Sequence, residues 1–172
     1  NNTPAGEIVY LEGNYTFDAP QGEWTAVNYN AEGWKKGKGA FGTNDMPVVR
    51  TSWNTKDIWV RREFNLNDVP ADTPIYLKYS HDDVFELYLN GEKLVATDYS
   101  WKNNVVLELS DKVRTKMREG KNVIAAHCHN TTGGAYVDFG LYTTNKETAG
   151  FENIAIQKSV DVLPTQTYYT FT

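Results

Sequence analysis

Apolar and polar residues alternate over several short stretches of this sequence, a pattern typical of half-buried β-strands. The clearest stretch is "DIWVRREFNL", residues 57–66. One face of this strand would carry Ile58, Val60, Arg62, Phe64 and Leu66, and the opposite face Trp59, Arg61, Glu63 and Asn65. The same pattern predicts strands in residues 74–80, 84–96, 103–110, 122–130 and 136–143, and a further pair in 151–162 and 167–171. Within 84–96, Asn90-Gly91 between two apolar runs predicts a hairpin.

Helical signals are confined to "SDKVRTKMREGKN", residues 110–122. Ser110 is a typical N-cap, Val113 and Met117 lie one helical turn apart, and Gly120 would end the helix. Residues 22–55 are rich in Gly, Lys and Asn and alternate weakly, so we predict a long loop there. Together these patterns predict an all-β fold, an antiparallel β-sandwich of the jelly-roll type with one short helix.

Composition narrows the classes of partner. The 172 residues suffice for a core without disulfides, and the net charge of −5 is spread without a basic cluster, which argues against a nucleic-acid partner. No apolar run approaches the ~20 residues of a membrane helix, so we expect no membrane partner. The segment "NNTPAGEIVY" lacks the features of a signal peptide. Aromatic residues make up 13% of the chain, which leaves rings available for a surface.

The pair His127-x-His129 is the first candidate site. In a strand both imidazoles point to the same face, so a metal could take two ligands there, and His81, Asp82 or Asp83 in "SHDDVF" could supply a third. The competing interpretation, which we favour, is that the histidines are packed and hydrogen-bonded near a sheet end. Cys128 would face away from both histidines, which argues against nucleophilic catalysis. No carboxylate pair or phosphate-binding loop stands out, and we expect no cofactor.

Aromatic residues in polar connections form the second candidate site. Tyr99 and Trp101 lie in "ATDYSWKNN", Trp53 lies in "VRTSWNTKD", and Tyr136 follows a Gly-Gly turn. Such rings can stack on the apolar face of a sugar while Asn and Asp bond its hydroxyls. Alternatively, these rings fold back and cover the open ends of the sandwich.

Four segments resemble the galactose-binding-like jelly roll at the N-termini of β-galactosidase-type glycoside hydrolases. They are "AEGWKKGKGAFG", "TKDIWVRREFNL", "SHDDVFELYLNGEKL" and "GKNVIAAHCHNTTGGAYVDFGLY", and the resemblance covers Trp24 to Tyr142. The family's scaffold features match Trp34, Trp59 with Arg61 and Phe64, and Asp82 with Tyr88, Asn90 and Gly91. The resemblance implies a noncatalytic domain, some of whose relatives bind sugar through rim loops.

The last stretch, "IAIQKSVDVLPTQTYYTFT", is similar to the opening of the N-terminal β-rich domain of glutaminase A-like proteins of bacteria and fungi. We therefore expect residues 1–150 to form the sandwich, and 151–172 to be closing strands or the start of the next module of a longer, secreted or periplasmic chain.

Three functions follow as expectations. The first is an accessory module of a larger hydrolase, glutaminase-like or glycosidase-like, that binds carbohydrate weakly through Trp53, Tyr99, Trp101 and Tyr136. The second is a structural domain that packs against the neighbouring catalytic domain of the same chain. The third is a metal-dependent hydrolase that uses His127, His129 and His81.

Overall fold

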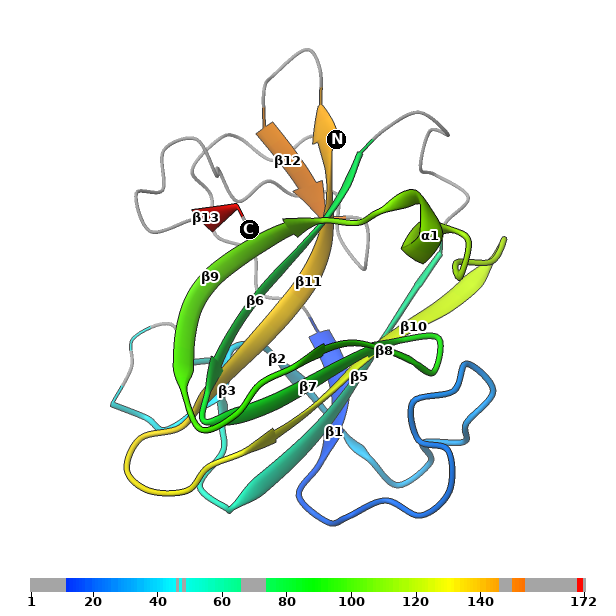
Figure 1. The fold of residues 1–172 in the computed structure, drawn as a ribbon. Coiled ribbons are helices and arrows are strands. Elements are labelled where there is room, and N and C mark those ends of the chain that lie inside the picture. Colours follow the sequence, from blue (N-terminus) through cyan, green and yellow to red (C-terminus); the bar gives the residue numbers. More distant parts are fainter. Residues whose placement is uncertain are drawn as a thin grey trace.

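The computed structural model describes residues 12–45, 47, 49–65, 74–145, 150–153 and 170–171, and within them the chain is built from strands (Figure 1). The first strands are β1 (Glu12–Thr16), β2 (Lys35–Lys38), β3 (Phe41–Gly42), β4 (Thr51–Ser52), β5 (Asp57–Asn65), β6 (Ile75–Asp82) and β7 (Val84–Leu89). After them come β8 (Glu92–Ala96), β9 (Trp101–Glu108), the helix α1 (Asp111–Arg114), β10 (Lys121–His129), β11 (Tyr136–Asn145), β12 (Gly150–Asn153) and β13 (Thr170–Phe171).

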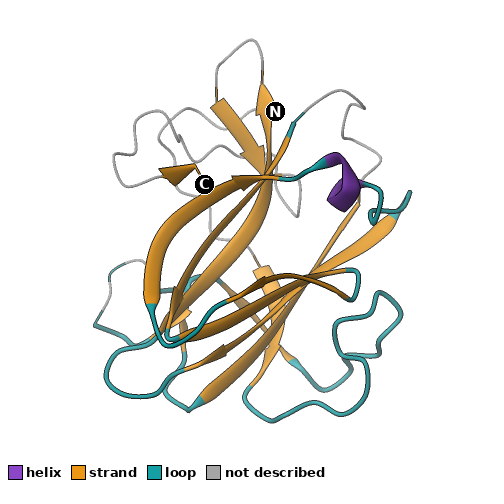
Figure 2. Cartoon of the chain, in the orientation of Figure 1, coloured by secondary structure: helices purple, strands orange, loops and turns teal. Residues whose placement is uncertain are grey.

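The described strands form two sheets that pack face to face, with loops gathered at their ends (Figure 2). One sheet has the order β2-β1-β5-β10-β7-β8, and we call it sheet A. The other, sheet B, has the order β13-β9-β6-β11-β3-β4, and β12 also pairs with β11. The pairs β3–β4 and β9–β13 are parallel and the other described pairs are antiparallel. The predicted all-β sandwich is confirmed.

The core lies between the inward faces of the two sheets, as the alternation predicts. Sheet A contributes the inward side chains of β5, β7 and β10, and sheet B those of β6 and β11. These side chains are Ile58, Val60, Phe64, Phe85, Leu87, Leu89, Ile124, Ile75, Leu77, Tyr79, Val137, Phe139 and Leu141. Burial of this apolar surface is the main force that holds the two sheets together.

Arg62 is the polar exception on the inward face of β5. Its guanidinium is fully buried, donates a hydrogen bond to the Phe139 carbonyl, and pairs with the Asp138 carboxylate at 3.0 Å. It also lies over the Phe139 ring, 4.6 Å from the centroid. A Cβ at Gly39 would collide with both members of this ion pair, so the chain has glycine there. Arg62 therefore joins sheet A to β11 of sheet B.

Residues 22–34 form a loop over part of the outer face of sheet A, the blue loop at the lower right of Figure 1. Arg61, the residue of β5 that precedes Arg62, fixes this loop by donating hydrogen bonds to the carbonyls of Trp24 (2.7 Å) and Ala26 (2.9 Å). The prediction of one unbroken loop from 22 to 55 is wrong, because β2, β3 and β4 lie within it. The strand β2, "KKGK", is an exposed edge strand paired only with β1 among the described strands, so no burial pattern marks it in the sequence.

Two local predictions are confirmed. Asn90 and Gly91 both have positive φ, 48° and 87°, which the tight turn between β7 and β8 requires. Ser110 caps α1 by accepting a hydrogen bond from the Val113 N–H at 3.3 Å. The helix is shorter than predicted. Of the predicted pair of strands near the C-terminus, only β12 and β13 fall within the described residues, so the boundary at 150 stays a prediction.

Candidate functional site

The four aromatic residues of the predicted sugar site fall into two groups. Tyr99 and Trp101, at the start of β9, are the large hydrophobic side chains that are exposed in the described part of the chain, at 62% and 67%. Tyr136, the first residue of β11, is half-buried. Trp101 and Tyr136 lie at the same end of sheet B, because both are paired with Asp82, the last residue of β6. Tyr99 lies two residues before Trp101, in the connection that leads into β9.

Trp53 does not belong to this surface, and its assignment to a sugar-binding rim is wrong. Its indole is fully buried in the core, and its backbone N–H donates to the Gly42 carbonyl at 2.8 Å. The connection from β4 to β5 therefore turns the ring inward, where it closes the end of the sandwich. The structure shows no hydrogen-bond partner for the indole Nε1 of Trp53. The free energy gained by burying so large an apolar group outweighs the cost of this unpaired N–H.

One row of residues crosses three strands of sheet B at this end. Trp101 of β9 is opposite Asp82 of β6, and Asp82 is opposite Tyr136 of β11. Residues opposite one another in an antiparallel pair share a face of the sheet. Adjacent strands lie about 4.8 Å apart, which places the backbones of Trp101 and Tyr136 roughly 10 Å apart, with Asp82 between them. We call Trp101, Asp82 and Tyr136 the rim row.

The surroundings of Asp82 destabilise the charged form of its carboxyl group. Burial raises its pKa, and the hydrogen bond and negative charge of Asp83 raise it further, to about 7. The charged form of Asp83, by contrast, is stabilised. Burial raises its pKa, but hydrogen bonds from Asp82 and from the backbone N–H groups of Thr131 and Thr132 outweigh burial and lower it. The two neighbouring carboxyl groups therefore ionise one after the other, Asp83 at a lower pH than Asp82.

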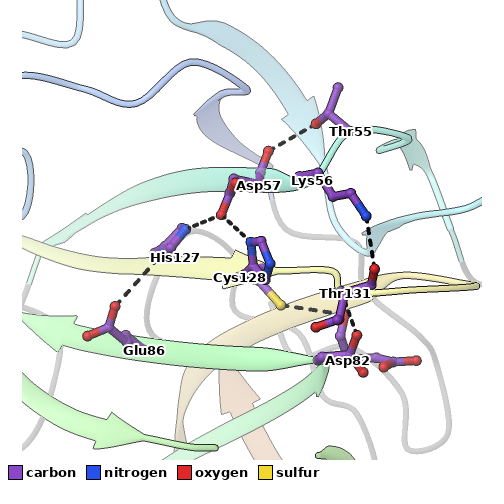
Figure 3. Close-up of polar contacts among 10 residues, drawn as sticks. Thr55, Lys56, Asp57, Asp82, Glu86, His127, Cys128 and Thr131 are labelled. Carbon is purple, nitrogen blue, oxygen red and sulfur yellow. Dashed lines mark hydrogen bonds and ion pairs between the residues drawn. The ribbon is translucent and has the colours of Figure 1, made fainter. Parts of the chain in front are cut away.

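Loop 130–135 is tied to the rest of the rim by polar contacts. The Thr131 N–H donates to Asp83 Oδ2 at 2.8 Å, and Lys56 Nζ donates to the Thr131 carbonyl at 2.9 Å. Figure 3 shows Thr131 between Lys56 and Asp82. The Asn130 N–H also donates to the Lys56 carbonyl, at 2.7 Å. These bonds give the neighbourhood of Asp82 a fixed shape.

The two histidines of the H-x-H motif lie on the outer face of sheet A, as the period of two predicts. His127 Nε2 and His129 Nδ1 both contact Asp57 Oδ1, at 2.8 and 2.9 Å, and His127 Nδ1 lies 3.5 Å from Glu86 Oε1 (Figure 3). We call Asp57, Glu86, His127 and His129 the histidine cluster. It spans β5, β10 and β7, and the Trp59 ring stacks on His127 at 4.7 Å.

Both carboxylates of the histidine cluster are stabilised in their charged form. Burial raises the pKa of Asp57, but hydrogen bonds from His127 and His129 outweigh burial, so its pKa is lowered. A hydrogen bond from Lys93 lowers the pKa of Glu86. The Lys93 Nζ lies 2.8 Å from Glu86 Oε2. The cluster therefore satisfies its own polar groups and holds three strands together.

The structure does not bring the three histidines of the proposed metal set together. His81 is buried on the inward face of β6, stacks on Phe85 at 5.1 Å, and places its Nδ1 2.7 Å from the Asp83 carbonyl. His127 and His129 lie on the outer face of the other sheet. Among the residues that the structure describes, no three His, Cys, Asp or Glu side chains are placed to hold a metal ion.

Cys128 faces the core between the two histidines, as predicted. Its thiol is buried beneath β10, and burial raises its pKa far above the usual value, which leaves it unsuited to nucleophilic chemistry.

Sequence reasoning missed Asp57 and Glu86, and it treated Asp82 as a scaffold residue or a possible metal ligand, not as part of the sugar site. Asp57 is the first residue of a clear alternating stretch, on the same face as Trp59. The sequence therefore predicts the face of β5 on which Asp57 lies. It does not predict that Asp57 is opposite β10, because the register between strands that are distant in sequence does not follow from local pattern.

No protein-family model matches the sequence, and the search of curated proteins found no match either. Similar solved structures exist. A β-glucuronidase of glycoside hydrolase family 2 has a TM-score of 0.58 and 16% identity over 79% of this chain and 17% of that chain. A family 2 glycosyl hydrolase from Bacteroides cellulosilyticus has a TM-score of 0.55 and 14% identity over 78% of this chain and 20% of that chain. A β-glucuronidase from an uncultured Clostridium sp. has a TM-score of 0.54 and 15% identity over 80% of this chain and 28% of that chain.

These likenesses define the fold as a β-sandwich of the kind found within glycoside hydrolase chains. The chain spans 17% to 28% of the length of those structures. The comparisons give no support to the similarity of residues 154–172 to glutaminase A-like proteins. Within the described residues, no helix has the length and apolar character needed to cross a bilayer.

Proposed function

We propose that this chain is a noncatalytic β-sandwich module of a larger, secreted or periplasmic glycoside hydrolase, and that it binds carbohydrate weakly at the rim of sheet B. The observation that carries this proposal is the exposure of Tyr99 and Trp101, with Trp101 in one row with Tyr136 at the end of sheet B. The shared fold with segments of glycoside hydrolases supports the parent class. The location outside the cytoplasm rests on the sequence resemblance alone.

Exposed rings suit this task because the CH groups on one face of a pyranose are apolar. A tryptophan in contact with that face removes apolar surface from water, and its position on a strand fixes its direction at little entropic cost. With few rings and no enclosing cavity, we expect affinities in the millimolar to high micromolar range, about −4 to −6 kcal/mol.

The direct test is a glycan array probed with the purified chain and with Trp101→Ala and Trp101→Phe. We expect the alanine variant to lose about tenfold or more in affinity, and the phenylalanine variant to keep part of it, since a smaller ring still stacks. Unchanged binding by the alanine variant would exclude the rim as the site. No binding by the wild-type chain at glycan concentrations up to the millimolar range would contradict carbohydrate binding by this module.

The second candidate function is a purely structural module. It is favoured because this fold makes up only 17% and 20% of two similar chains, so most of each chain lies outside it and could pack against it. In this case Tyr99 and Trp101 would be covered by the neighbouring catalytic domain of the same chain. The discriminating measurement is the melting temperature of the longer chain with wild-type residues and with Tyr99→Ala and Trp101→Ala combined. A structural role predicts a clear decrease in melting temperature, and a sugar-binding role predicts almost none.

A further inference from the structure

Asp82 occupies the centre of the rim row, between an exposed ring and a half-buried ring. We propose that Asp82 is the specificity-determining polar group of the sugar site, and that the site selects neutral sugars over uronates. This inference rests on the proposed carbohydrate binding and adds the group that orients the sugar.

Three polar groups near the row already have partners. Ser80, two residues before Asp82 on the same face, accepts a hydrogen bond from the Asn104 N–H at 2.8 Å. Asp138, two residues after Tyr136, pairs with Arg62. Asp83 binds loop 130–135 through the Thr131 N–H. The hydrogen bond with Asp83 that raises the pKa of Asp82 needs only one carboxyl oxygen, and a carboxyl group has a second oxygen to offer a ligand.

The position of Asp82 matches the needs of a sugar. A ring lying on Trp101 presents its hydroxyls at its edge, toward the neighbouring strand, and Asp82 is the residue opposite Trp101 on that strand. A carboxylate accepts hydrogen bonds from hydroxyls, and such charge-assisted bonds are stronger than neutral ones. Because Asp82 is held in a strand next to a tied loop, it is already fixed in place before the sugar binds.

The charge near the row disfavours an acidic sugar. Asp82 and Asp83 are adjacent carboxyl groups, and a uronate would bring a further negative charge close to them. Lys102 of β9 is opposite His81 and not Asp82, so its side chain belongs to the other face of the sheet. The ammonium group of Lys56 is already bound to the Thr131 carbonyl. The charged form of Asp82 is destabilised by burial and by Asp83, and carboxyl groups with a strongly raised pKa are found most often at functional sites.

The test measures binding of methyl β-D-glucopyranoside, methyl β-D-galactopyranoside, methyl α-D-mannopyranoside and methyl β-D-glucuronide to the 172-residue chain at pH 8, by NMR titration. The variants are Asp82→Ala, the isosteric Asp82→Asn, and Trp101→Ala. Glu119→Gln, an exposed carboxylate in the turn before β10, is the matched control for the change in charge. Thermal unfolding of each variant checks that it folds.

We expect at least one neutral glycoside to bind, with the glucuronide about tenfold weaker or not detected. Asp82→Ala should weaken the neutral glycoside about tenfold, Asp82→Asn by less, and Glu119→Gln not at all. If Trp101→Ala removes binding while both Asp82 variants bind as wild type does, the role of Asp82 is wrong and the carbohydrate site stands. If the glucuronide binds at least as well as the neutral glycosides, the neutral selectivity is wrong. If no glycoside binds the wild-type chain, the site and the inference both fail.

Discussion

Asp57 and Asp82 are half-buried aspartates at the same end of the sandwich, one on each sheet, and their surroundings act on them in opposite directions. Hydrogen bonds from two histidines lower the pKa of Asp57. Burial and a neighbouring carboxyl group raise the pKa of Asp82 to about 7. The histidine cluster therefore stabilises the fold, whereas the rim row carries a carboxyl group that destabilises it when charged. Such a group, placed beside an exposed tryptophan, is more easily explained by binding than by folding.

The largest expected effect separates the two tryptophans that the sequence placed in one site. Trp53→Ala should destabilise the fold by about 3–5 kcal/mol, since it leaves a cavity in the core, whereas Trp101→Ala should change the free energy of unfolding by less than about 0.5 kcal/mol. Urea denaturation measures both. Trp53→Phe is the control, and it should lose less than the alanine variant because a ring still fills the site. Equal losses for Trp53→Ala and Trp101→Ala would show that the rim ring is also part of the scaffold.

The next effect tests the histidine cluster as a structural element. Asp57→Ala should cost about 1–3 kcal/mol at pH 7, because two imidazoles lose their shared acceptor. Glu63→Ala, on the same face of β5, is the control. It breaks an exposed ion pair to Lys121 of 3.0 Å and should cost less than about 1 kcal/mol. Urea denaturation that gave the two variants the same loss would contradict a stabilising role for the cluster.

The last effect is a pair of opposite pH dependences. A lowered pKa means that Asp57 adds stability at pH values above its unfolded pKa of about 3.9, and that this stability is lost as the pH falls through its folded pKa. A raised pKa means that Asp82 favours the fold at low pH, and that this advantage is lost as the pH rises from about 4 to about 7.

These directions give opposite results for the two asparagine variants. Relative to wild type, Asp57→Asn should be less stable at pH 7 and more nearly equal at pH 3, and Asp82→Asn should gain stability as the pH rises from 4 to 8. Melting temperatures across pH 3–8 check both directions. A profile in which the two variants shift in the same direction would refute the contrast between the two aspartates.

The sequence predicts the fold well where local pattern decides the structure. Alternation in residues 57–65 places Ile58, Val60 and even Arg62 on the buried face, and Asn90-Gly91 predicts the hairpin, because both signals depend only on neighbouring residues. The edge strand β2 was not predictable, since its residues are exposed and its identity comes from pairing with β1.

The candidate site was predictable only in part. Pattern alone could not tell Trp53 from Trp101, because both follow polar residues and the difference lies in which way a loop turns. The row of Trp101, Asp82 and Tyr136 depends on the registers of three strands, and these registers follow from packing of the whole sandwich. The shared face of His127 and His129 was predictable, but not their acceptor on β5.

The most direct test of the central claim compares the two regions in one experiment. The chain, labelled with ¹⁵N, has five tryptophan indole signals, and Trp101→Phe and Trp59→Phe assign the two that matter. On titration with a glycoside that the module binds, we predict shifts of the Trp101 indole and of the backbone amides of Asp82 and Tyr136, while the Trp59 indole next to the histidine cluster stays unchanged. Shifts at Trp59 and His127 without shifts at Trp101, or no shifts at all across the set of glycosides, would contradict the account.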